Sequence, residues 1–141
     1  MSAISTQIVI DGITLALRDA FPDSFITAKP VEQGLRRPAF IVHPLIQGES
    51  DLPSNRSRRF SSFVIHHFPE HPCDDWTVIG DALLDVLKVI TLPGGDMLRG
   101  TDISYECVDG VLHFSVTYKY NISGVSEAPV MEKLSIMQGG Q

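Results

Sequence analysis

The sequence predicts an α+β domain of two layers, in which an antiparallel sheet of about five strands carries two helices on one face. Three observations predict this class. Two segments repeat apolar residues at helical spacing, several segments are rich in aromatic and β-branched residues, and Asp109-Gly110 lies between two alternating segments. In chain order these elements read helix, three strands, helix and two strands, which is the pattern of an antiparallel sheet covered by helices.

The first helix is predicted near the N-terminus. Ile10, Ile13 and Leu17 recur at helical spacing and are followed by Ala20-Phe21, while polar residues occupy the other side. Pro22 ends the helix, because proline lacks the backbone N–H that a helix interior uses. The chain therefore begins with an amphipathic helix that buries one face.

Three strands are predicted between the two helices. Residues 25–31 and 39–43 are short apolar stretches separated by Glu32-Gln33-Gly34, which suggests a hairpin with a longer turn. Residues 60–68 combine aromatic and β-branched side chains and are followed by prolines, which suits a third strand.

Residues 47–59 are predicted to form an exposed, mobile loop. The segment contains glycine, proline, several Ser and Asn residues and charges of both signs without periodicity. Long loops without secondary structure are unusual in a compact domain and often carry function. The segment is therefore the first candidate for a partner contact. Its basic residues are Arg56, Arg58 and Arg59.

The second helix is predicted over residues 76–90. Apolar side chains from Trp76 to Ile90 recur in steps of three and four residues. Asp74 and Asp75 lie near the positive N-terminal end, and Pro93-Gly94-Gly95 closes the segment.

A β-hairpin is predicted at Asp109-Gly110, because this dipeptide suits the positive φ angles of a type I′ turn. The turn fixes the register, which places apolar residues on one side of the sheet and polar residues on the other. The expected apolar pairs are Cys107 with Leu112, Tyr105 with Phe114 and Ile103 with Val116. The expected polar pairs are Glu106 with His113, Ser104 with Ser115 and Asp102 with Thr117.

Residues 128–141 are predicted to form a C-terminal extension of a single domain that spans residues 1–141. The length suits one domain with one core. The extension is too apolar for an idle terminus, so it either adds another strand or docks on a neighbouring subunit. Its candidate contact residues are Met131, Leu134 and Ile136.

Composition narrows the classes of function. The net charge is −6 and the pI is about 5.2, which disfavours sequence-specific binding to nucleic acid. No apolar stretch approaches the ~18 to 20 residues of a membrane span, and the N-terminus lacks the basic start of a signal peptide. We therefore expect a soluble protein of cytosolic origin with no membrane partner, and we expect both cysteines to be reduced thiols.

One cluster has the residue types of a zinc site: His66, His67, His71 and Cys73. On a strand, however, His66 and His67 point to opposite faces, and no paired Cys-x-x-Cys or His-Glu-x-x-His pattern supplies further ligands. No nucleophile elbow or Ser-His-Asp set is present either. The sequence therefore predicts no metal, cofactor or reaction centre. A metal-dependent enzyme built on His66, His71 and Cys73 is the least favoured alternative.

Several short motifs occur in an order that is informative as a whole. They are an opening helix that runs into Ala20-Phe21-Pro22, then Val31-Glu32-Gln33-Gly34 and Pro38-Ala39-Phe40-Ile41, residues 63–69, Leu98-Arg99-Gly100, and residues 105–114 with Tyr118. Together they cover most of the chain, and their order resembles the phage tail terminator family of tailed phages and prophages of Gram-positive bacteria.

The resemblance implies a virion structural protein without catalysis or cofactor, made in the bacterial host cytoplasm. It implies a homo-hexameric ring at the head-proximal end of the tail. The ring would halt polymerisation of the tail tube protein and join the tail to the head connector proteins, with DNA passing through its lumen. A head-tail neck adaptor or another tail-completion module is the alternative. Rings use heterologous contacts, for which the three arginines and three apolar residues named above are the candidates.

Overall fold

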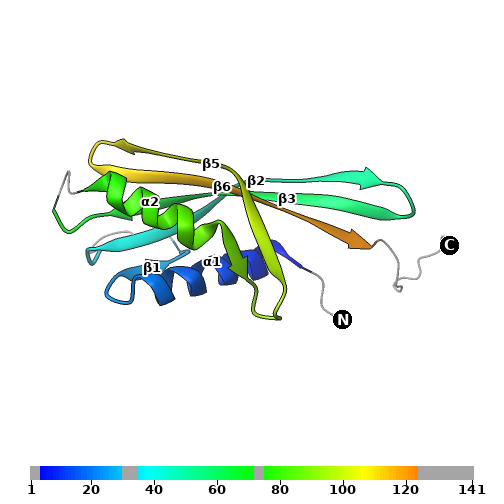
Figure 1. Ribbon diagram of the computed structural model, residues 1–141, viewed down its shortest axis with the longest axis horizontal. Coiled ribbons are helices and arrows are strands. Elements are labelled where there is room, and N and C mark those ends of the chain that lie inside the picture. The colour runs from blue at the N-terminus through cyan, green and yellow to red at the C-terminus, as the bar shows by residue number, and fades with distance from the viewer. Residues whose placement is uncertain (1–3, 30–34, 72–74, 124–141) are drawn as a thin grey trace.

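The computed structural model describes residues 4–29, 35–71 and 75–123. It confirms the predicted α+β class, with six strands in place of about five (Figure 1). The elements are α1 Thr6–Ala20, β1 Phe25–Thr27, β2 Ala39–Leu52, β3 Arg56–Phe68, α2 Trp76–Leu87, β4 Val89–Thr91, β5 Met97–Val108 and β6 Val111–Ser123. Both helices lie against the same side of a curved sheet, and the core fills the space between them.

The sheet is mixed, with the strand order β1-β2-β3-β6-β5-β4. β1 runs parallel to β2, whereas all other neighbours are antiparallel. The predicted hairpin between the first two strands is therefore wrong, because a parallel pair needs a crossover connection that a turn cannot supply. β1 ends at Thr27, and the rest of the predicted strand with Glu32-Gln33-Gly34 lies largely outside the described residues.

The first helix agrees with its predicted periodicity. Ser5 is its N-cap, and the Ser5 hydroxyl accepts a hydrogen bond from the Ile8 N–H at 3.2 Å, which satisfies one free donor of the first turn. Ile13 and Leu17 are fully buried against the sheet. The helix ends at Ala20, directly before Phe21-Pro22.

The second helix is shorter than predicted. It ends at Leu87, and Ile90 belongs to β4. The Gly100 N–H donates to the Lys88 carbonyl at 2.7 Å, so the chain leaves the helix and pairs with β5 instead. Ile90 is only 1% exposed, and it fills the same core from a strand. Its spacing therefore fitted the helical pattern although its backbone is extended.

The hairpin at Asp109-Gly110 is confirmed, since both residues have positive φ angles of 51° and 78°. The predicted pairs hold from Val108 with Val111 as far as Ser104 with Ser115. The predicted pair of Asp102 with Thr117 is wrong, because Thr101 and not Asp102 lies opposite Thr117, whereas Ile103 still lies opposite Val116. Between those points the register shifts, so Asp102 and Ile103 together face Val116 in a β-bulge, with Asp102 at a φ of 52°.

The segment at residues 47–59 is not a loop. β2 continues to Leu52 and β3 begins at Arg56, so only residues 53–55 form the turn. Both strands carry polar side chains on either face, because the hairpin extends beyond the helices and neither face is covered (Figure 1). The alternation of apolar and polar residues in the sequence is lost here for the same reason. We call residues 47–62 and the adjacent 117–123 of β6 the arm.

Replacing Tyr118 by Phe is expected to lower the free energy of unfolding by about 1 to 2 kcal/mol. Tyr118 is fully buried, and its hydroxyl donates a hydrogen bond to the Leu87 carbonyl at 2.6 Å. This carbonyl belongs to the last turn of α2 and has no hydrogen-bond partner within the helix. Burial also raises the pKa of Tyr118. Urea unfolding measures the loss.

The matched control is Tyr120→Phe on the same strand and face. Its hydroxyl lies 3.5 Å from the Ser61 Oγ, a much weaker contact. We expect a smaller loss for this variant, and equal losses for the two variants would contradict the role given to the Tyr118 hydroxyl.

Candidate assembly surface

The arm is a three-stranded sheet whose two faces differ in charge. We call the face that continues the helix-covered side of the sheet the inner face, and the opposite face the outer face. Because side chains alternate along a strand, successive residues of β3 point to the inner and the outer face in turn. The inner face carries Glu49, Asp51 and Arg59. The outer face carries Arg56, Arg58 and Lys119. The arm thus presents three cations together on its outer face.

On the inner face the charges are largely paired. Arg59 lies opposite Glu49, and its Nε donates to the Glu49 Oε1 at 2.6 Å. The same hydrogen bond lowers the pKa of Glu49. Both side chains are 42% exposed, so the pair adds little to stability.

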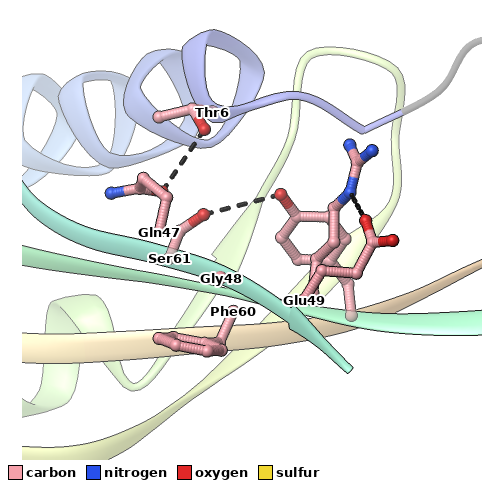
Figure 2. Close-up of a pocket in the computed structure, with 8 residues that line it drawn as sticks. Thr6, Gln47, Gly48, Glu49, Phe60 and Ser61 are labelled. Atoms are coloured by element: carbon pink, nitrogen blue, oxygen red, sulfur yellow. Dashed lines mark hydrogen bonds and ion pairs between the residues drawn. The ribbon is translucent and has the colours of Figure 1, made fainter. Parts of the chain in front are cut away.

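A hollow of about 290 Å³ lies between this inner face and the start of α1. Figure 2 shows Thr6 of α1 above Gln47, whose side-chain oxygen accepts a hydrogen bond from the Thr6 hydroxyl at 3.3 Å. Ser61 and Tyr120 also line the hollow, together with the ion pair of Glu49 and Arg59. The hydrogen bond between Thr6 and Gln47 joins the base of the arm to the first helix.

The outer face carries an aromatic side chain among its cations. Phe60 points to the opposite side of the strands from Gln47 and Ser61 (Figure 2). Its ring lies over Gly48, where a Cβ atom would come within 2.3 Å of the ring, so the absence of a side chain at Gly48 creates the space that the ring occupies. Arg58, Phe60 and Lys119 line a hollow of about 390 Å³ together with the polar residues Ser50, Ser62, Asp102 and Thr117.

Arg58 is held in place by a neutral partner. Its Nε donates to the Asn121 Oδ1 at 3.1 Å, across the β3–β6 pair. The contact orients the guanidinium without neutralising its charge. Arg58 and Arg56 are both exposed, and the single ion pair found in the described part of the chain is that of Arg59 with Glu49.

The outer face of the body, meaning the described residues outside the arm, carries a row of three histidines. The ring of His66 lies 4.6 Å from that of His43 and 4.3 Å from that of His113. Burial, followed by the two neighbouring imidazoles, lowers the pKa of His66 to about 4. The His66 side chain is therefore neutral near pH 7.

His67 lies on the other side of the sheet, as predicted from strand alternation. It is buried against Phe40, with 4.5 Å between ring centroids, and burial lowers its pKa to about 4. Within residues 4–29, 35–71 and 75–123, no three histidine, cysteine or acidic side chains are placed to hold a metal ion. Cys73 of the predicted cluster lies outside those residues.

The structure separates the predicted contact residues. Arg56 and Arg58 share the outer face of the arm, whereas Arg59 lies on the inner face in an ion pair. Met131, Leu134 and Ile136 lie outside the described residues, as does the whole predicted extension. The sequence reasoning missed Phe60 and Lys119 as members of this surface, because the pairing of β3 with β6 joins distant parts of the chain.

The family model described as phage tail terminator protein matches residues 8–129. No curated protein matches the chain. One similar solved structure shares 13% identity and a TM-score of 0.46 over 89% of this chain and all of that chain. A likeness this distant carries no argument about function. Among the described helices, none has the length and apolar character needed to cross a membrane.

Proposed function

Because the chain belongs to the phage tail terminator family, we propose that copies of it form a ring, with six subunits, that caps the head-proximal end of the tail tube. The family is one of structural phage tail proteins and is not known as an enzyme family. In this proposal the ring stops addition of tail tube protein and then binds the head connector proteins, so the chain ends up in the virion tail.

The arm is the observation that carries the proposal. β1 pairs with β2 only at residues 39–41, and β5 follows β6 only as far as Tyr118, so both edges of the arm lack a strand partner within the described chain. Unpaired edges and uncovered faces are surfaces that other chains complete. Arg56, Arg58 and Lys119 make one of those faces cationic on a chain that is acidic as a whole.

A ring of this kind stops tube growth if its two sides differ. One side binds the last ring of tube subunits, and the other side lacks the surface that the next tube subunit needs. That second side is then free for the connector. Because the chain carries a net charge of −6, it repels phosphate backbones over most of its surface, which favours passage of DNA through the lumen without tight binding.

Removing the arm tip is expected to abolish control of tail length while the domain still folds. The variant replaces residues 49–59 by Asn-Gly, so that a two-residue turn joins Gly48 to its partner Phe60. In a phage that lacks its own copy of the gene, we expect electron micrographs to show overlong tails. Circular dichroism and thermal melting of the purified variant check the fold.

A matched control replaces only the turn residues 53–55 by Asn-Gly and keeps both strands. This variant should give tails of normal length joined to heads. Tails of normal length that fail to join heads, in the arm-deleted variant, would instead favour the neck adaptor. Normal infectious particles from the arm-deleted variant would contradict both assignments.

A further inference from the structure

We propose that neighbouring copies of this chain bind head to tail, with the outer face of the arm of one copy docked on the solvent-exposed stripe of α2 of the next. This inference rests on the proposed ring and names the contact between its subunits. It follows from two rows of side chains that match in order and have opposite charges.

The first row lies on the arm. Arg56, Arg58 and Phe60 occupy alternate positions of β3 and therefore point to the same side. At about 3.3 to 3.4 Å per residue, successive members of the row are about 7 Å apart. Both arginines are exposed and have no acidic partner in the described part of the chain. The row therefore reads cation, cation, aromatic.

The second row lies on α2. Asp85, Asp81 and Val78 are spaced by four and three residues, so they form one stripe on the helix, with about 5 to 6 Å between Cβ atoms. All three are exposed, and Val78 is exposed to 62%. The row reads anion, anion, apolar.

Asp81 already accepts one hydrogen bond. The Tyr105 hydroxyl donates to its Oδ1 at 2.6 Å, and this bond raises the pKa of Tyr105. A carboxylate has about four acceptor sites, so the bond orients Asp81 and leaves room for a guanidinium.

Placing Phe60 against Val78 brings Arg58 to Asp81 and Arg56 to Asp85. The two rows belong to separate parts of the molecule, since the arm projects beyond the helices on the side away from the N-terminal end of α2 (Figure 1). One copy therefore offers one row to each of two neighbours. Such a contact is heterologous, and it closes into a ring when its rotation allows.

The overall charge supports a second copy as the partner. The arm holds four cations and two carboxylates, a net charge of +2, which leaves −8 on the rest of the chain. Any second copy thus attracts the arm at long range. A nucleic acid would also attract Arg56, Arg58 and Lys119, but the acidic remainder of the chain opposes its approach.

The test uses two charge-reversed variants. The arm variant carries Arg56→Asp and Arg58→Asp, and the helix variant carries Asp81→Arg and Asp85→Arg. Alone, each variant brings like charges together at the contact. Mixed in equal amounts, the two variants can alternate, because the acidic arm meets the basic helix and the unchanged arm meets the unchanged helix. Their masses are measured by light scattering and sedimentation at low salt.

We expect each variant alone to raise the apparent dissociation constant for self-association at least about tenfold, and the mixture to regain association. Rising salt should weaken the wild-type oligomer, since exposed charges are screened. The control Lys29→Asp with Arg99→Asp makes the same change of net charge as the arm variant, away from both rows, and should associate like the wild type. Circular dichroism confirms that each variant is folded.

Three results would overturn the contact: a wild-type chain that stays monomeric at all concentrations, single variants that associate normally, or a mixture that does not recover. An arm variant that loses retention on double-stranded DNA while keeping its mass would assign the surface to nucleic acid instead. Tail length in a phage lacking its own copy separates the two proposals. If the mixture associates again but still gives overlong tails, the contact between copies is supported and the capping function is contradicted. If either variant alone gives tails of normal length, the contact is contradicted and the capping function stands.

Discussion

Phe63→Ala is expected to lower the free energy of unfolding by about 3 to 5 kcal/mol. Phe63 is fully buried on the helix-covered face of β3, and its ring centroid lies 6.3 Å from that of Tyr118. Removing the ring loses its burial and leaves a cavity that the neighbouring β6 and helices fill only in part. Because domains of this size are stable by about 5 to 15 kcal/mol, urea unfolding should show a large fraction of the total stability lost.

Phe60→Ala provides the comparison on the same strand. Phe60 is half-buried and lies on the outer face of the arm, where no helix covers it. We expect this change to lower stability by only about 1 kcal/mol or less, while it weakens association between copies. Equal destabilisation by the two changes would contradict the assignment of the two faces.

The folded chain is expected to lose stability as the pH falls from about 6.5 toward 4. Burial holds the pKa of His66 and of His67 at about 4 in the folded state, against 6.5 for an ordinary histidine. The unfolded chain therefore binds protons first as the solution is acidified. The stabilisation that these two histidines contribute is complete above pH 6.5 and declines between pH 6.5 and 4. Below pH 4 the two groups cause no further loss of stability.

The surroundings of the two histidines differ, which allows them to be tested separately. His66 faces His43 and His113, and Glu106 lies opposite His113 on β5, whereas His67 faces Phe40. Urea unfolding at pH 7 and pH 5 should show a smaller difference in stability for His66→Gln and for His67→Leu than for the wild type.

The change His71→Gln, at an exposed position after β3, is the control and should leave that difference unaltered. An unchanged pH dependence in the doubly substituted chain, with both His66 and His67 replaced, would show that other groups control acid stability.

Local sequence patterns predicted the parts of the fold that depend on neighbouring residues. Helical spacing identified α1 and most of α2, and Asp109-Gly110 identified both the turn and five pairs of the following register. The bulge at Asp102 and Ile103 was missed, because alternation of side chains continues to look regular across an extra residue. The parallel pairing of β1 was missed because it depends on a connection that leaves no short-range signal.

The candidate surface was only partly predictable. Arginines at 56 and 58 were identified by their clustering, but their segment was taken for a loop because the strands of the arm have no buried face to impose alternation. Lys119 joins them through β6, about 60 residues further along the chain. The matching row on α2 was missed as well, because sequence reasoning treats the polar side of a helix as solvated by default.

The register of the outer hairpin has a consequence for how such proteins vary. From Glu49 and Arg59 outward, every residue of β2 finds its β3 partner within the hairpin itself. Two residues can therefore be added to each strand next to the turn, beyond Leu52 and Arg56, without changing the β3–β6 register or moving any core side chain. The reach of the arm can thus change while the buried core between the sheet and the two helices stays as it is.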